Sequence, residues 1–369
     1  MQSKAKKILV LFVEPMLYGF DLIREVYEKT EHEFQYVFCD TGLTGKDNLA
    51  LPEGAVVCSG GAQQRKEQIN RIFDSFGPDF AIINGYVGTE QVAAIKYCQK
   101  HGIRYAIESD TPLHIPESKI KALLKKFYLR RLLSNKYCYG FPGGTIQREN
   151  LVYYGIKEEK CHIMPMSVSS DRLLKVKETL PKKDDIKRQY GLSGKTVFLF
   201  VGRLEPVKNA AVLINAFSEM KKENRDVSLV VLGDGSQKDM LTELIASKNI
   251  EDVHFMGYVT FPRIVEFYKM ADVFVLPSTH EPWGLVVNEA MIMGLPVIVS
   301  SKVGCRKDLV IDGENGMVFE DNNQEMLQEK MRDILKQDLD VYSENSVKRI
   351  EQWNFDYYLR QFTGAICDE

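Results

Sequence analysis

Short apolar runs alternate with longer amphipathic segments along most of the chain, and this alternation restricts the fold more than any other feature of the sequence. An apolar run of about four to eight residues is typical of a buried strand, and an intervening helix lets successive strands pair in parallel. In the first half, the predicted strands are 7–13, 34–39, 81–83, 105–108, 136–139 and 161–164, and the predicted helices include 21–29, 63–75 and 90–101. The pattern predicts an α/β fold in which helices cover a parallel sheet.

The alternation is interrupted once and then starts again. Residues 174–195 have little apolar content, mixed charge, a proline and glycines, which is typical of a linker with a surface helix. After it, the predicted strands are 196–201, 227–232, 253–256, 272–276, 296–300 and 316–319. Because 369 residues exceed the ~250 to 300 of a single core, we expect one domain over 1–175 and a second over 190–346.

The bulk properties exclude several classes of protein. A net charge of −3 gives no overall attraction to nucleic acid. The seven cysteines are scattered and form no C-x-x-C pair, which indicates reduced thiols and neither a disulfide framework nor a zinc site. The apolar run 8–13 is shorter than the ~7 to 15 residues of the apolar region of a signal peptide, and no run approaches the ~18 apolar residues of a membrane span. We therefore expect a cytoplasmic protein.

The stretch 272–300 has the most informative pattern of functional residues. It predicts a strand, a tight Pro-Trp-Gly corner, a helix and a second strand. Glu281 precedes the corner and Glu289 lies inside the helix, so both can border one crevice beside the helix N-terminus. Free N–H groups there favour an anion, and the two carboxylates would accept hydrogen bonds from hydroxyl groups. The alternative is an ordinary strand-turn-helix unit with two solvated glutamates.

Two further loops of the second half also follow predicted strands. Loop 201–209 carries Arg203 and Lys208, a planar fork and a compact point charge that suit a diphosphate. Loop 232–237 has two glycines that permit close approach of a ligand, and Ser236 is placed to cap the next helix. Each alone has a simpler interpretation, as solvated cations or a plain turn. Three such loops in one sheet point together to a ligand site. No G-x-G-x-x-G follows the first strand, which counts against a dinucleotide-dependent dehydrogenase.

With these motifs in place, the sequence resembles the retaining glycosyltransferases of family 4. The resemblance rests on the E-x7-E spacing from Glu281 to Glu289 and on five matching segments. These are VGRLEPVKN (201–209), LGDG (232–235), HFMGYV (254–259), 271–300 and DGENGMVF (312–319). It implies the GT-B architecture, in which two Rossmann-like, doubly wound domains face a central cleft. The first domain would bind the acceptor and the second the nucleotide-sugar donor.

The resemblance also assigns roles to residues. Arg203 and Lys208 would hold the departing diphosphate, and Glu281 would lie beside the donor sugar; these three form the implied catalytic site. The donor-binding residues that it implies are Glu289, Trp283, Gly284, Leu285, Gly233, Asp234, Gly235, Tyr258 and Val259. Neither a metal nor a cofactor is implied, because cations and helix-end N–H groups would stabilise the leaving group.

The implied reaction is transfer of a sugar, with retention, from a nucleotide diphosphate sugar to a glycan or a lipid-linked saccharide. A UDP-sugar is favoured over a GDP-sugar, and the setting would be assembly of a bacterial surface polysaccharide or glycolipid. Two alternatives stay open from the sequence. One is a GT-B-fold nucleotide-sugar epimerase or hydrolase, and the other is a non-catalytic subunit that binds nucleotide sugars.

The first half departs from the family pattern. The glycine-rich loop that many relatives carry after the first strand is replaced by VEPMLYGFD, where Gly19 is the nearest equivalent. The family histidine is replaced by a segment that contains Glu108 and Asp110, with His114 a few residues later. These four residues are the acceptor-side candidates. For His114 a solvated or packed side chain is the simpler interpretation.

The segment 117–136 concentrates positive charge. It has seven Lys and Arg residues against Glu117 alone. By helical periodicity, one face carries Ile120, Leu123, Leu124, Phe127 and Tyr128, which suits the core, and Leu129, Leu132 and Leu133 fall among the cations on the other side. A basic helix with an exposed apolar strip is typical of a segment on an anionic membrane, here the inner face. An ordinary solvated basic helix is the alternative.

The C-terminal segment 347–369 is expected to be helical and to cross back to the first domain. It is rich in aromatic residues, and Trp353, Phe355, Tyr357 and Tyr358 are the candidate anchors. Packing within the second domain is the alternative.

Overall fold

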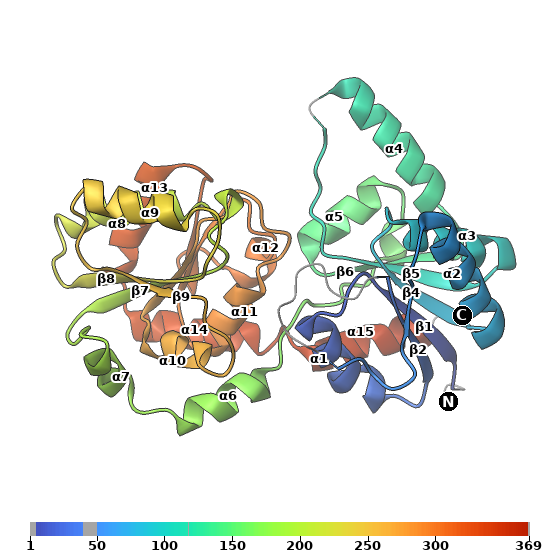
Figure 1. The fold of residues 1–369 in the computed structure, drawn as a ribbon, viewed down its shortest axis with the longest axis horizontal. Helices are drawn as coiled ribbons and strands as arrows, with labels where there is room; N and C mark the ends of the chain where they lie inside the picture. Colours follow the sequence, from blue (N-terminus) through green and yellow to red (C-terminus); the bar gives the residue numbers. More distant parts are fainter. Residues whose placement is uncertain (1–4, 40–49, 117, 368–369) are drawn as a thin grey trace. The chain divides into compact units, whose positions relative to one another are not determined.

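The structure, a computed structural model, describes residues 5–39, 50–116 and 118–367. The chain divides into two compact units. Unit 1 comprises Met1–Ser167 and Asn354–Glu369, and unit 2 comprises Val168–Trp353. Each unit has its own sheet with helices around it (Figure 1). Glu117, which belongs to the predicted basic cluster, lies outside the described residues.

The sheet of unit 1 has six parallel strands in the order β3-β2-β1-β4-β5-β6. Its strands are β1 (Lys7–Phe12), β2 (Glu33–Phe38), β3 (Val56–Val57), β4 (Phe80–Asn84), β5 (Arg104–Ser109) and β6 (Cys138–Pro142). This is the doubly wound order of a Rossmann fold, in which the chain starts at the centre and builds outward twice. Loops after β1 and β4 therefore diverge at the carboxyl edge of the sheet.

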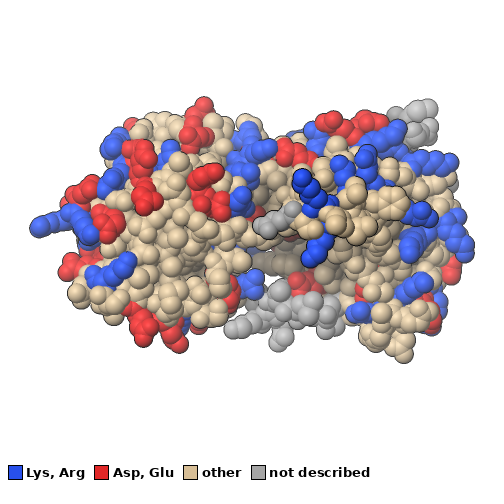
Figure 2. All heavy atoms as spheres, turned by 90° about the horizontal axis from the view of Figure 1, so that it is seen from above, with Lys and Arg blue, Asp and Glu red and all other residues tan. Residues whose placement is uncertain are grey.

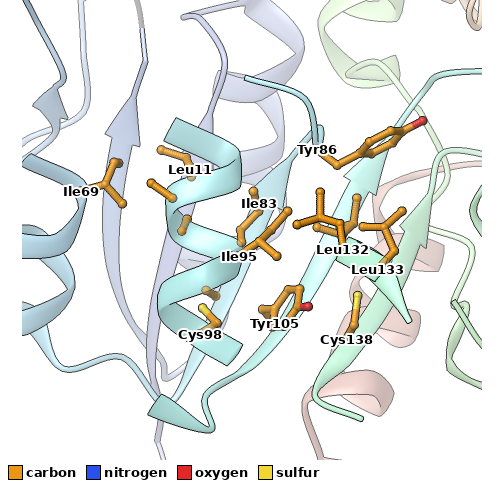
Figure 3. Close-up of a cluster of buried hydrophobic side chains, with 14 of the residues drawn as sticks. Leu11, Ile69, Ile83, Tyr86, Ile95, Cys98, Tyr105, Leu132, Leu133 and Cys138 are labelled. Atoms are coloured by element: carbon orange, nitrogen blue, oxygen red, sulfur yellow. The ribbon is translucent and has the colours of Figure 1, made fainter. Parts of the chain in front are cut away.

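Helices cover both faces of this sheet because residues alternate between the faces along each strand. The α-helices of unit 1 are α1 (Leu17–Glu25), α2 (Ala62–Phe76), α3 (Thr89–His101), α4 (Lys119–Leu133), α5 (Thr145–Tyr153) and α15 (Phe355–Cys367). Leu9 and Leu11 pack with α2 and α3 in one cluster, part of which Figure 3 shows. Ile8 and Val10 point the other way, into a cluster with α1 and α15.

The sheet of unit 2 repeats this topology, with the order β12-β11-β10-β7-β8-β9 and parallel pairs throughout. Its strands are β7 (Thr196–Val201), β8 (Val227–Leu232), β9 (Val253–Gly257), β10 (Val273–Leu276), β11 (Val297–Ser300) and β12 (Gly316–Phe319). β7, the first strand of the unit, pairs with β10 at the centre. The topological switch point, where ligands bind in folds of this kind, lies between these two strands.

Nine α-helices are described in unit 2. They are α6 (Ser170–Thr179), α7 (Lys183–Gln189), α8 (Ala210–Lys221), α9 (Lys238–Ser247), α10 (Ile264–Met270), α11 (Leu285–Ile292), α12 (Arg306–Leu309), α13 (Gln324–Ile334) and α14 (Leu339–Ile350). Short 3-10 turns occur at η1 (Tyr27–Lys29), η2 (Glu158–Lys160) and η3 (Pro206–Lys208). No helix in the described part of the chain has the length and apolar character needed to cross a membrane.

Two strand assignments differ from the sequence-based prediction. The predicted strand 161–164 is wrong, because this segment runs beside β6 with a single bridge, between Gly140 and Cys161. The short strand Val56–Val57 at the sheet edge was not predicted. Two residues are too few to produce an apolar alternation, so the sequence carried no signal for this strand.

The segment predicted as a linker, 174–195, packs as part of unit 2. It contains the end of α6 and all of α7, and Ile186 and Leu192 are buried. Lys187 donates to Asp272 Oδ2 at 2.6 Å, and the same oxygen accepts the backbone N–H of Val197 at 2.6 Å. A polar composition suggested a flexible connection, but these contacts fix α7 beside the starts of two central strands.

The two apolar faces of α4 are arranged opposite to the prediction. Leu129, Leu132 and Leu133 are buried in the core of unit 1. The face that was expected to suit the core is exposed; Phe127, for example, retains 68% of its accessible surface. Only the last turns of α4 contact the sheet, because the chain enters β6 a few residues after the helix ends.

The C-terminal aromatic residues divide between the two units. Helix α15 belongs to unit 1, where Phe355, Tyr358 and Phe362 are buried against α1, β2 and the centre of the sheet. Trp353 belongs to unit 2 and stacks on Trp283, with ring centroids 5.6 Å apart. Helix α15 is therefore a structural part of unit 1.

Replacing Phe362 with Ala should destabilise unit 1 by about 3–5 kcal/mol, because a fully buried ring is lost and a cavity remains. Both tryptophans lie in unit 2, so tryptophan fluorescence reports unit 2 and far-UV circular dichroism reports both units. In urea unfolding of Phe362→Ala, the transition of unit 1 should have a lower midpoint than in wild type. This transition is the part of the dichroism change that tryptophan fluorescence does not follow. Thr363→Ala, at an exposed position of the same helix, should stay within about 0.5 kcal/mol of wild type. A loss of under about 1 kcal/mol for Phe362→Ala would contradict this packing.

Candidate functional site

The candidate site lies at the carboxyl ends of β7 and β10, at the switch point of the unit 2 sheet. The loop after β7 contains Arg203 and Lys208, and the loop after β10 contains Glu281. A backbone hydrogen bond from Thr279 N–H to the Val207 carbonyl, 2.8 Å long, joins the two loops. The structure thus brings together residues that are more than seventy positions apart in sequence, as their placement after strands predicted.

Lys208 and Glu281 form an ion pair between Nζ and Oε2. Their side chains retain only 17% and 12% of their accessible surface, so solvent screens this pair less than an ordinary surface pair. Ser278 Oγ lies 3.5 Å from the same carboxylate oxygen. Arg203, in contrast, is exposed. Lys208 is therefore fixed by its ion pair, whereas the exposed Arg203 can move toward a ligand.

The backbone of Glu281 is held by the segment that follows β11. Its N–H donates to the Lys302 carbonyl at 3.3 Å, and its carbonyl accepts the Gly304 N–H at 2.9 Å. Ser300 Oγ donates to the Ser278 carbonyl, which ties the turn before Glu281 to the end of β11. The position of the carboxylate is therefore set by three neighbouring strands and not by one flexible loop.

The corner after Glu281 requires glycine. Gly284 has φ of +101°, and a Cβ there would lie 3.3 Å from Glu281 Cγ, Leu276 Cδ2 and Val303 Cγ1. Trp283 is buried, and its Nε1 donates to Asn288 Oδ1 at 2.9 Å. Helix α11 then starts at Leu285, and its first N–H groups have no acceptor within the helix. This places a helix N-terminus beside the ion pair, as the sequence predicted.

Glu289, one turn into α11, receives a hydrogen bond that the sequence did not predict. Tyr268 O–H donates to Glu289 Oε2 at 2.7 Å. Burial raises the pKa of the Tyr268 phenol well above its ordinary value, and the neighbouring Glu289 carboxylate raises it further, so the phenol stays a donor. Tyr268 lies in α10, far from Glu289 in sequence and in no recognisable motif, so only the fold connects the two.

The glycines of the 232–237 loop serve the packing of one loop on another. A Cβ on Gly233, where φ is +145°, would lie 1.8 Å from the Gly202 carbonyl oxygen, and one on Gly235 would lie 2.6 Å from the Leu204 oxygen. Leu204 N–H donates to the Asp234 carbonyl at 2.9 Å, which joins the loops directly. The sequence predicted that these glycines let a ligand approach closely. In the structure, the group that lies close to them is the β7 loop.

Ser236 does not cap α9, which corrects the prediction. Its Oγ donates to Glu205 Oε2 at 2.6 Å, and its N–H donates to Oε1 at 3.1 Å. The helix starts two residues later, after Gln237, without a side-chain cap. The serine instead fastens the two loops together, and the hydrogen bonds to its side chain and N–H lower the pKa of Glu205.

Tyr258 and Val259, two of the predicted donor-binding residues, lie directly after β9. Tyr258 is exposed and Val259 is half-buried. Gly233 N–H donates to the Gly257 carbonyl at 2.8 Å, so this segment adjoins the Gly-Asp-Gly turn. The three predicted donor-site loops and the β9 loop thus lie along one edge of one sheet.

The four acceptor-side candidates of unit 1 differ in their surroundings. Gly19 is buried in α1, while Asp110 and His114 are exposed. Glu108 is buried, where it accepts hydrogen bonds from Tyr358 O–H at 2.9 Å and from Asn84 Nδ2 at 3.2 Å. The pKa of Glu108 is raised, because the effect of burial exceeds that of the two hydrogen bonds, which lower the pKa. In this structure Glu108 anchors α15 to the carboxyl edge of the sheet.

Among the described residues, no group of three or more His, Cys, Asp or Glu side chains is placed to hold a metal ion.

Comparison with known proteins supports the resemblance in unit 2. Residues 182–352 match the family Glycosyl transferases group 1. The α-D-kanosaminyltransferase of Streptomyces kanamyceticus is 30% identical over 142 residues, which are 38% of this chain and 36% of that protein. The mannosylfructose-phosphate synthase of Agrobacterium fabrum is 32% identical over 156 residues, 40% of this chain and 34% of that protein. The similarity thus covers only about a third of the length of each relative.

The fold of the whole chain is similar to that of a solved structure with bound UDP. Anabaena HepE in complex with UDP superposes with a TM-score of 0.77 and 17% identity, over 98% of this chain and 99% of that one. With the two Rossmann-type sheets described above, this likeness confirms the predicted GT-B fold class.

Replacing Gly233 with Ala should disrupt the candidate site and destabilise unit 2. The new Cβ would clash with the Gly202 carbonyl oxygen in a backbone conformation that only glycine adopts readily. Gly313→Ala is the matched control, because φ there is +82° but the space around it is open. We expect the control to cost about 1–2 kcal/mol and Gly233→Ala at least about 3 kcal/mol, measured by tryptophan fluorescence during urea unfolding. Equal losses would contradict the loop packing.

Proposed function

We propose that this protein is a retaining glycosyltransferase that transfers a sugar from a UDP-sugar to a glycan or a lipid-linked saccharide. The observation that carries this proposal is the placement of the Lys208–Glu281 ion pair beside the N-terminus of α11, at the switch point of the unit 2 sheet. Such a position suits the diphosphate of a nucleotide sugar, since cations and free N–H groups converge there.

The diphosphate would be held by Lys208, Arg203 and the first N–H groups of α11. When the bond from the anomeric carbon to the β-phosphate oxygen breaks, its electron pair stays on UDP, and negative charge grows where these groups converge. Fixed donors and cations that meet developing charge lower a barrier more than groups that must first reorganise. Lys208 is held in place by Glu281 before the ligand arrives, so it needs little reorganisation.

The remaining donor contacts follow from the same loops. Glu289 would accept hydrogen bonds from the ribose hydroxyls, and its carboxylate is already oriented by the Tyr268 phenol. Tyr258 and Val259 would border the base, next to the turn formed by 233–235. Glu281, with the backbone of Trp283, Gly284 and Leu285, would lie beside the donor sugar and the distal phosphate.

No metal is included in the proposed reaction, because the charge of the leaving diphosphate is met by Lys208, Arg203 and the α11 N-terminus. A pair of carboxylates on opposite sides of the sugar, as in glycosidases, is likewise not part of the proposal. The acceptor would instead react on the face from which the diphosphate leaves, so that the configuration at the anomeric carbon is kept.

The donor base and the acceptor are the finer parts of the proposal. HepE was solved with UDP and with UDP-glucose, and this neighbour in fold supports the expected preference for a UDP-sugar. Unit 1 would bind the acceptor through the carboxyl edge of its sheet, where Gly19, Glu108, Asp110 and His114 were predicted. Because Glu108 is buried and doubly hydrogen-bonded, we expect it to position Asn84 and α15 and not to contact the acceptor itself.

Replacing Lys208 with Ala should lower the turnover of a UDP-sugar about 10²- to 10³-fold, because a cation beside the leaving group is lost. Glu289→Ala should raise KM for the donor and weaken UDP binding about tenfold or more, since two ribose hydroxyls lose their acceptor. Donor hydrolysis and calorimetric titration of UDP, each with and without EDTA, measure both effects. Lys222→Ala, at an exposed lysine of unit 2, is the matched control.

Three outcomes would contradict the proposal. If the Lys208 and Glu289 variants turn over donor as well as wild type, the site is wrongly assigned. If wild type binds UDP but releases no sugar to water or to any saccharide acceptor, the protein is a binding subunit. If EDTA abolishes turnover, the leaving group depends on a metal.

A further inference from the structure

Helix α4 presents a continuous apolar face to solvent. Five large side chains on it keep most of their accessible surface. They are Ile120 (73%), Leu123 (69%), Leu124 (63%), Phe127 (68%) and Tyr128 (53%). At about 100° per residue they occupy an arc of roughly 140°, centred opposite the buried face. Within the described part of the chain, no other helix exposes as many large apolar side chains.

The outward orientation of this face is fixed by the other side of the helix. Leu132 and Leu133 pack in the unit 1 core beside Tyr105 and Cys138 (Figure 3). Lys125 Nζ lies 5.2 Å from the ring centroid of Tyr154, and Lys126 Nζ lies 3.9 Å from that of Tyr153. A rotation that buried the apolar face would remove the leucines from the core and break both cation–π contacts. The packing of the helix therefore keeps this face exposed.

Cations border the exposed apolar face. Lys119 and Arg130 lie along one edge and Lys121 along the other, while Arg131 lies at its C-terminal end, and all four are exposed. The helix contains no Asp or Glu. In Figure 2, blue Lys and Arg atoms flank tan surface where this helix faces the viewer. Apolar side chains framed by cations match the two layers of an anionic membrane surface, with acyl chains beneath phosphate groups.

We propose that α4 docks unit 1 on an anionic lipid bilayer, with Leu123, Leu124 and Phe127 inserted below the headgroups and the flanking cations on the lipid phosphates. Charge complementarity selects this partner. A second copy of the chain would bring two like-charged helices together, and nucleic acid offers no apolar layer for the five exposed side chains. The proposal is independent of the proposed enzymatic function, because vesicle binding is measured without donor or acceptor.

Flotation with vesicles tests the proposal. The probe is phosphatidylcholine alone or phosphatidylcholine with about a third phosphatidylglycerol. We expect wild type to float with the anionic vesicles and not with the neutral ones, and the bound fraction to fall as salt rises, because the headgroup contacts are screened. Equal binding to both vesicles, or binding to neither, would overturn the proposal.

Two pairs of variants separate the apolar and the charged contributions. Leu124→Gln with Phe127→Gln should weaken partition to anionic vesicles at least about tenfold. Arg130→Gln with Arg131→Gln should do the same and reduce the salt dependence by about half, because two of the four flanking cations remain. The matched controls are Val341→Gln, at an exposed valine on α14, and Lys222→Gln with Lys248→Gln, at two exposed lysines of unit 2. All of these positions are exposed, and unchanged thermal unfolding confirms the fold of each variant.

Two further results would count against a membrane partner. If the Arg130→Gln, Arg131→Gln variant loses vesicle binding and the Leu124→Gln, Phe127→Gln variant does not, the surface is a general polyanion site. Sedimentation equilibrium could show that wild type is a dimer and that the Leu124→Gln, Phe127→Gln variant is a monomer. If wild type also binds neither kind of vesicle, a second copy of the chain covers the apolar face.

Discussion

The parallel pairing of β7 with β10 is the constraint on which the candidate site depends. β7 is the first strand of unit 2 and β10 starts the second half of its sheet, so the loops after them meet at the switch point, where ligands bind in folds of this kind. The Thr279–Val207 backbone hydrogen bond and the Lys208–Glu281 ion pair join these two loops. Glycines at 233, 235 and 284 then allow the neighbouring loops to approach closely enough to hold this arrangement.

Much of this site could be predicted from the sequence, because its residues directly follow apolar strands. Parallel strands bring their carboxyl ends to one edge, so Arg203, Lys208 and Glu281 were expected along the same edge of the sheet once the strands were identified. The partners that orient them could not be predicted. Tyr268 reaches Glu289 from another helix, and Ser236 binds Glu205 in another loop, and neither contact leaves a periodic or spaced pattern in the chain.

The errors have a common physical origin. Helical periodicity identifies apolar faces but not which of two faces meets the core, and α4 has apolar residues on both sides. The orientation of α4 depends on β6, which starts shortly after the helix ends. Only the last turns of the helix therefore pack on the sheet. Composition misled in the same way at 174–195, where single buried residues and the ion pairs of Asp272 fix a polar segment. Long-range partners, which a local window does not contain, decided both cases.

We propose that a nucleotide diphosphate binds at the Lys208–Glu281 ion pair beside α11, and a crystal structure of the protein with UDP tests this most directly. The account predicts diphosphate oxygens within about 3 Å of Lys208 Nζ and the Arg203 guanidinium, and ribose hydroxyls on the Glu289 carboxylate that Tyr268 orients. A nucleotide ordered elsewhere, with Lys208 still bound to Glu281 alone, would contradict it.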